Sequence, residues 1–250
     1  MTTSAMRETE EASPMAVGEL ITALQSLYGD ALRTVVRFGS AVAGEVLPGQ
    51  SDTNLLIIVD AIPLSALLHN SEAVRKWTTA GNPAPLLLTL EEWRSSADIF
   101  AMEYADILHR HEVLVGDAPF EGVRVAERDL RLHVEREAMG KLLQLRRAVM
   151  AVGSDSQLQL RVLVNGLSTL MVIFRGVSRV AGSAPSMDYV RLSHDVATLA
   201  AFDVRPFERL VRHARREVQI PVSDVTQVLT GVLDAMGRLV AYLDRAGGNA

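Results

Sequence analysis

The sequence FGSAVAGEVLPGQSDTNLLIIVD, residues 38–60, decides the fold of this chain. It begins where a β-branched and aromatic run, residues 32–38, meets Gly39 and Ser40, and it contains the continuous apolar run NLLIIV at residues 54–59. Runs of this kind bounded by glycine and small polar residues are typical of β-strands, and a continuous apolar run indicates a strand buried on both faces. We therefore expect two neighbouring strands joined by a loop or a short helix.

The polar residues of this stretch have the chemistry of a nucleotide site. Gly39 permits a tight turn and a close backbone approach to a ligand, and Ser40 offers a hydroxyl and an N–H to a phosphate oxygen. Asp52 and Asn54 are two positions apart, so in an extended segment both side chains point to one face of the sheet. Two oxygen ligands beside a phosphate-holding turn suit Mg²⁺ and a nucleotide. Gly39 and Ser40 are therefore the candidate nucleotide-binding residues, and Asp52 and Asn54 the candidate metal-binding and catalytic residues.

A purely structural interpretation of the same residues stays open. Gly39 and Ser40 can form a strand-to-helix turn that holds no ligand. Ser51, Asp52 and Asn54 are all common turn residues, so they can also form a turn or a cap before the second strand.

The stretch resembles the signature of the nucleotidyltransferase superfold, which includes DNA polymerase beta and kanamycin nucleotidyltransferase. In that superfold a Gly-Ser pair is followed, after a loop, by Asp-x-Asp or Asp-x-Glu on the next strand. Here eleven residues separate Ser40 from Asp52. The resemblance implies an α/β nucleotidyltransferase domain followed by a helical bundle. It also implies transfer of a nucleoside monophosphate from a nucleoside triphosphate (NTP), with Mg²⁺ as cofactor, to a hydroxyl of a small molecule or a protein.

The chain differs from that signature at two positions where the family has acidic residues. Asn54 stands where the family has a carboxylate, and the strand expected at residues 86–90 carries no acid. Glu91 and Glu92 follow it; they fit the first turn of a helix, or one of them could replace the family's third acid. Losing one unit charge about 4 Å from a cation forfeits a few kcal/mol at an effective dielectric of ~20. The alternative function is therefore a catalytically degenerate module that binds a nucleotide, or that regulates or oligomerises.

The chain divides near residue 120. Residues 1–120 carry 7 Lys/Arg and 16 Asp/Glu, a net charge of −9, whereas residues 121–250 carry 18 and 14, a net charge of +4. Strand patterns occur only in the first part. We expect a disordered lead-in (1–14), an α/β domain (15–120) and a helical bundle (121–250). The fold class is α+β, a small mixed sheet covered by helices followed by an all-α antiparallel bundle. The expected bundle helices are 130–152, 157–180, 189–199, 206–218 and 222–243.

Composition excludes several classes of protein. With 48% hydrophobic and 22% charged residues the bulk of the chain is not disordered, and with no cysteine it holds no disulfide, thiolate zinc site or iron–sulfur cluster. No apolar run approaches the roughly 18 residues that cross a bilayer, so we expect a cytoplasmic protein without a membrane partner.

Two groups of arginines in the second half carry separate expectations. Arg209, Arg212, His213 and Arg216 form a basic stripe, but interleaved aromatic residues are nearly absent, so nucleic acid is an unlikely partner. Arg175 lies in an otherwise apolar helix, where we expect it to pair with a carboxylate or to cap the domain interface. A homo-oligomer formed through the helical half also fits the sequence.

Overall fold

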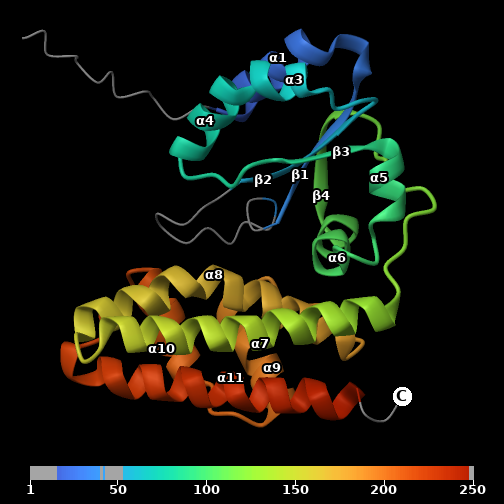
Figure 1. Cartoon of the computed structure of the whole chain (residues 1–250). Coiled ribbons are helices and arrows are strands. Elements are labelled where there is room, and N and C mark those ends of the chain that lie inside the picture. Colours follow the sequence, from blue (N-terminus) through green and yellow to red (C-terminus); the bar gives the residue numbers. More distant parts are fainter. Residues whose placement is uncertain (1–15, 40–41, 43–52, 248–250) are drawn as a thin grey trace, which may run out of the picture.

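The computed structural model describes residues 16–39, 42 and 53–247, with only the backbone at 246 and 247 (Figure 1). Its four described strands form one sheet in the order β3-β2-β1-β4. β1 is antiparallel to both β2 and β4, whereas β2 and β3 are parallel, so the sheet is mixed as predicted. The strands are β1 (Leu32–Phe38), β2 (Asn54–Val59), β3 (Leu86–Thr89) and β4 (His111–Gly116).

Helices cover both faces of the sheet, which explains the continuous apolar runs of its two central strands. Val35 and Ile57 pack against α1 and α4 on one face, with Trp77 of α4 buried among them. Val36 and Ile58 point to the other face and pack against α5 and α6, the two helices that lie between β3 and β4 in sequence. The covering elements are α1 (Val17–Tyr28), η1 (Gly29–Ala31), α3 (Leu64–His69), α4 (Ser71–Thr79), α5 (Leu90–Ser95) and α6 (Ala101–His109).

The second half is helical, and its helices lie within a few residues of the predicted ranges, except that α10 ends earlier. α8 passes through the middle of this bundle, and Leu163, Leu170 and Phe174 on it are fully buried. The elements are α7 (Glu127–Val152), α8 (Ser156–Val180), α9 (Tyr189–Ala200), α10 (Arg205–Ala214), η2 (Val222–Asp224) and α11 (Val225–Gly247).

α8 differs from the expectation that no segment is apolar enough to cross a membrane. By length and composition alone it could do so, because its isolated polar residues leave a mean hydropathy of 1.5 over an 18-residue window. Of that window, 56% is buried inside the structure. The apolar surface of α8 is therefore used mainly in the core of the bundle.

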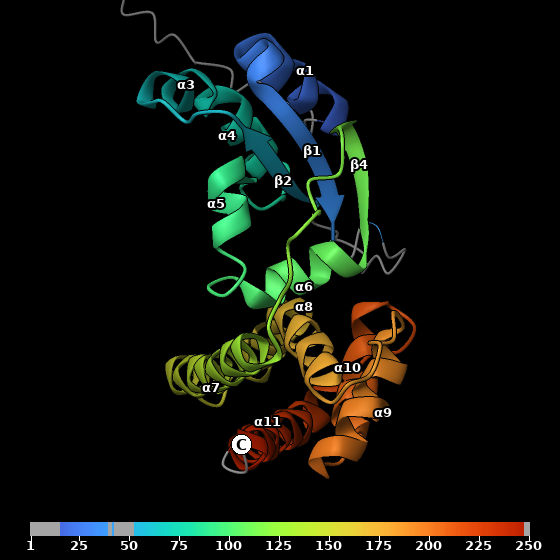
Figure 2. The same ribbon diagram turned by 90° about the vertical axis from the view of Figure 1, so that its right-hand side faces the viewer.

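α6 joins the two halves (Figure 2). Its Ala101 and Met102 pack into the core of the bundle, whereas Tyr104 and Ile107 on the same helix pack against the sheet. The predicted boundary near residue 120 falls in the connection between β4 and α7. The contact between the halves thus depends on a helix that precedes this connection in sequence.

Candidate functional site

The end of β1 and the start of β2 bring two of the predicted site residues together. Phe38 pairs with Asn54 across the two strands, and Gly39 follows with φ of +81°. A Cβ atom on Gly39 would lie 2.9 Å from Nδ2 of Asn54, which is closer than real Cβ contacts. Only glycine allows this backbone and this approach together. The Asn54 amide therefore occupies the space that a side chain at position 39 would take.

The start of β2 is fixed from a neighbouring loop. The Thr53 N–H donates to Oδ1 of Asn82 at 2.9 Å, and Nδ2 of Asn82 donates to the Trp77 carbonyl at 3.4 Å. Trp77 is itself buried in the core of the sheet half. Ser40 and Asp52, the other two predicted site residues, lie outside the described residues.

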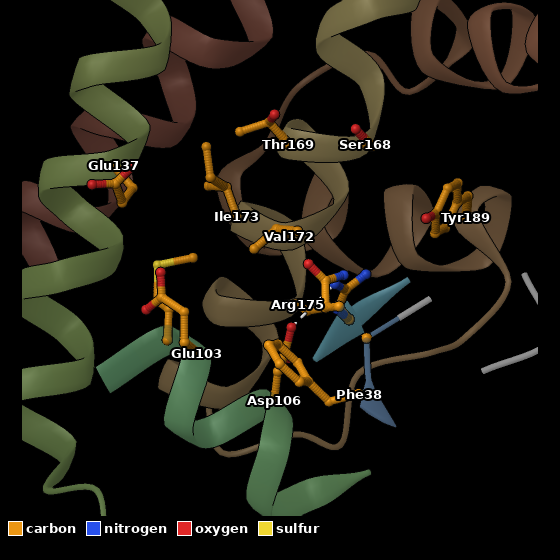
Figure 3. A pocket seen from close by; sticks show the side chains of 13 residues that line it. Phe38, Glu103, Asp106, Glu137, Ser168, Thr169, Val172, Ile173, Arg175 and Tyr189 are labelled. Atoms are coloured by element: carbon orange, nitrogen blue, oxygen red, sulfur yellow. Dashed lines mark hydrogen bonds and ion pairs between the residues drawn. The ribbon is translucent and has the colours of Figure 1, made fainter. Parts of the chain in front are cut away.

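A cavity of about 290 Å³ opens between this end of the sheet and the bundle (Figure 3). That volume is near the lower end of the ~300–1,000 Å³ found for small-molecule sites. Gly39 and Asn54 line it from the sheet, and α6, α7, α8 and the start of α9 line it from the other sides. The polar side chains on those helices are Glu103, Asp106, Glu137, Ser168, Thr169, Arg175 and Tyr189.

A buried ion-pair network forms part of the bundle side of the cavity. Asp106 accepts from Nη2 of Arg175 at 3.1 Å, and its other oxygen lies 2.6 Å from Nη1 of Arg179. Arg175 is only 7% exposed. Burial alone would lower its pKa, but the charge and hydrogen bond of Asp106, with a hydrogen bond to Tyr189, raise the pKa above its usual range. The expectation that Arg175 pairs with a carboxylate is confirmed.

Two further acids, Glu103 of α6 and Glu137 of α7, line another side of the cavity (Figure 3). Both lie near His133 of α7. Nδ1 of His133 accepts the Met102 N–H at 3.3 Å and lies 3.9 Å from Glu103, while its Nε2 lies 3.8 Å from Glu137. Burial raises the pKa of Glu103, more than the nearby His133 lowers it. A carboxylate with a raised pKa is a better proton acceptor than an ordinary one.

The acids near β3 do not contribute to this cavity. Oε2 of Glu92 accepts from the Thr89 N–H at 2.8 Å and, with the Thr89 hydroxyl, caps the start of α5. Neither Glu91 nor Glu92 lines the cavity. Among the residues that the structure describes, no three His, Asp or Glu side chains are placed to hold a metal ion. Of the two predicted metal-binding residues, Asn54 lines the cavity, and Asp52 lies outside the described residues.

Sequence reasoning missed the acids that the helices bring to the cavity. Glu103, Asp106 and Glu137 lie far from residues 38–60 in sequence, in helices whose periodicity indicates only packing. Arg175 was the one signal, because a charge in an apolar helix needs a partner.

Comparisons with known proteins leave the site to be interpreted from its own geometry. No protein-family model matches the chain, and no curated protein matches it. The resemblance to nucleotidyltransferases therefore rests on residues 38–60 and on the order of the two halves, and it stays a prediction.

Proposed function

We propose that the cavity at the end of β1 and β2 binds an NTP with Mg²⁺, and that the protein transfers its nucleoside monophosphate to a hydroxyl. The observation that carries the proposal is that Gly39 and Asn54, at the ends of β1 and β2, line one cavity together with the carboxylates of the helices. This arrangement supplies an approach for phosphates, an oxygen ligand for a cation and a proton acceptor within one cavity.

In this proposal each residue has a separate task. Gly39 lets the triphosphate approach the backbone, Ser40 donates to a phosphate oxygen, and Asp52 and Asn54 give oxygen ligands to Mg²⁺. The bound cation would neutralise charge on the phosphates. The acceptor hydroxyl oxygen forms a bond to the α-phosphorus as the bond to pyrophosphate breaks, and its proton passes to Glu103.

The geometry also favours a second function, a nucleotide-binding module without catalysis. Asn54 is neutral, and Asp106, which lines the cavity, is neutralised by Arg175 and Arg179. Both observations weaken the hold on a divalent cation. In this alternative the cavity takes a nucleotide, and the bundle acts as a regulatory or oligomeric element.

Calorimetric titration with Mg²⁺ and each NTP tests the proposal on the wild type, Asp52→Ala and Asp30→Ala. Asp30 lies beyond the other end of β1 and is exposed, so its variant is the matched control. We expect the wild type and Asp30→Ala to bind and Asp52→Ala to bind at least tenfold more weakly. If the wild type binds no NTP, both nucleotide functions are wrong.

Incubation with α-labelled NTPs and hydroxyl acceptors separates the two functions. Label transfer by the wild type, lost in Asp52→Ala, supports the enzyme. Binding without transfer in the wild type, with transfer gained in Asn54→Asp, identifies a degenerate module whose missing carboxylate is the one at position 54.

A further inference from the structure

The outer face of α7 exposes a line of large side chains. The members are separated by alternate steps of four and three residues, so on a helix they lie within about 40° of one line. Leu132 is 46% exposed, Met139 42%, Leu143 40% and Met150 77%. Such a row of exposed apolar residues, unlike scattered ones, indicates a surface that another chain covers. We call it the α7 stripe: Leu132, Arg136, Met139, Leu143, Arg146 and Met150.

α11 carries a second line of side chains, also separated by alternate steps of four and three residues, and its chemistry complements that of the α7 stripe. Its members are small or acidic where those of the α7 stripe are large or basic. α7 and α11 pack side by side and run in opposite directions, and no helix of the described part of the chain lies in front of them (Figure 1). We call this line the α11 stripe: Thr230, Asp234, Gly237, Ala241 and Asp244.

The two stripes share one register. Arg136, Met139 and Arg146 line the same shallow groove as Ala241 and Asp244. Because the helices are antiparallel, the next member of the α7 stripe toward its C-terminus lies beside the next member of the α11 stripe toward its N-terminus. Arg136 and Met139 thus lie in the groove with Asp244 and Ala241. Continuing the same steps, we infer that Leu143 lies at the level of Gly237 and Arg146 at that of Asp234, which also lines a second groove with Asp203 and Arg205.

We propose that the α7 and α11 stripes form the interface of a homodimer whose twofold axis runs parallel to the two helices. This axis places α7 of one copy over α11 of the other at the same level along the helices. Met139 and Leu143 then meet the small residues of the α11 stripe, Ala241 and Gly237 of the partner subunit, so large side chains fill the space that small ones leave.

The charges select this arrangement over the other twofold one. With the axis along the helices, Arg136 faces Asp244 of the partner subunit, and Arg146 faces Asp234 of the partner subunit. With the axis perpendicular to them, α7 lies against α7, and Arg136 faces Arg146 of the partner subunit. Like charges brought together at an interface disfavour that pairing. Within the described part of the chain, Arg146 and Asp244 form no ion pair, whereas Asp234 pairs with Arg238 at 2.8 Å and Arg136 lies 3.7 Å from Glu137. Each pair across the interface therefore joins one unpaired charge with one that already has an exposed partner in its own copy.

The area of the proposed interface predicts a reversible dimer. Two helices about 10 Å apart and about 30 Å long cover on the order of 600 Å² on each copy, somewhat below the ~800 Å² per partner of a stable interface. Glu137 lines the cavity from the side of α7 opposite the α7 stripe. The dimer therefore leaves the cavity open and does not depend on the function proposed for it.

Sedimentation velocity over a wide range of concentrations tests the dimer through a charge exchange. We expect the wild type to dimerise, Arg136→Asp and Asp244→Arg each to be monomeric, and the double variant to dimerise again because the pair is restored in reverse. Arg161→Asp, at an exposed arginine on α8, is the control and should dimerise like the wild type. Recovery in the double variant also shows that the single variants have not simply misfolded.

Cysteine cross-linking tests the orientation, since the chain has no cysteine of its own. Under oxidising conditions Met139→Cys/Ala241→Cys should give a covalent dimer, whereas Met139→Cys/Leu143→Cys should not. The reverse result would show that α7 packs against α7 and would overturn the proposed axis. A wild type that stays monomeric at every concentration and at low salt, or a dimer unaffected by both charge reversals, would overturn the interface.

Discussion

The two walls of the cavity are held in place by different kinds of interaction. The sheet wall, formed by the ends of β1 and β2, is held by backbone geometry. The positive φ of Gly39 and the pairing of Phe38 with Asn54 fix the positions of Gly39 and Asn54 there. The bundle wall, formed by α6 to α9, is held by buried charges: Asp106 of α6 pairs with Arg175 and Arg179 of α8. The first wall can be recognised in a short stretch of sequence, whereas the second exists only after helices have packed.

Breaking the bundle wall should have the largest effect. Asp106→Asn leaves Arg175 buried with no carboxylate partner, and removing one member of a buried ion pair costs about 3–5 kcal/mol. We expect the free energy of unfolding in urea, followed by circular dichroism, to fall by that amount. Trp77 and Trp93 both lie in the sheet half, so their fluorescence reports separately whether that half unfolds with the bundle.

An exposed ion pair is the matched control for this variant. Asp60 pairs with Arg33 in the sheet half, and both side chains are about half exposed to solvent. Asp60→Asn should cost far less than Asp106→Asn, because water already screens that pair. Equal losses for the two variants would contradict a special role for the charges between the halves.

Disturbing the sheet wall should have an intermediate effect. Gly39→Ala introduces a side chain at φ of +81° and 2.9 Å from the Asn54 amide, so we expect a loss of about 1–2 kcal/mol from backbone strain and displacement of Asn54. Urea unfolding measures the loss, and calorimetric titration with an NTP measures the effect on the cavity.

Gly81→Ala is the control that separates the cost of backbone strain from the cost of displacing Asn54. Gly81 has φ of +92°, but a Cβ there meets nothing within 4 Å. It should show the strain alone and should leave NTP binding unchanged. If Gly39→Ala costs no more than Gly81→Ala and binds an NTP as the wild type does, the contact with Asn54 has no role in the site.

The contrast between the walls explains how much the sequence could predict. The strand at residues 54–59 was recognised because its apolar run and its flanking polar residues are local signals, and the bundle helices because their periodicity is strong. The partner of Arg175 could be expected in kind but not in identity, since Asp106 lies in a helix of the other half. Glu103 and Glu137 gave no signal, because only the packing of α6 against α7 makes them neighbours.

The smallest effect should come from Glu103, which lies at the junction of the halves. Burial raises its pKa in the folded protein above the usual value of about 4.3, so folding favours its protonated form. Its contribution to stability is therefore full below the unfolded pKa and is lost as the pH rises through the folded pKa. Glu103→Gln cannot undergo this loss, so the variant should gain stability relative to the wild type as the pH rises from 4 to 7. The gain is small because the Glu103 side chain is 46% exposed and water screens it.

Urea unfolding across that pH range measures the gain in stability, with the exposed Glu121→Gln as control for the loss of one charge. A difference independent of pH would mean that the surroundings of Glu103 do not favour its protonated form, and would remove it as the proton acceptor of the proposed reaction.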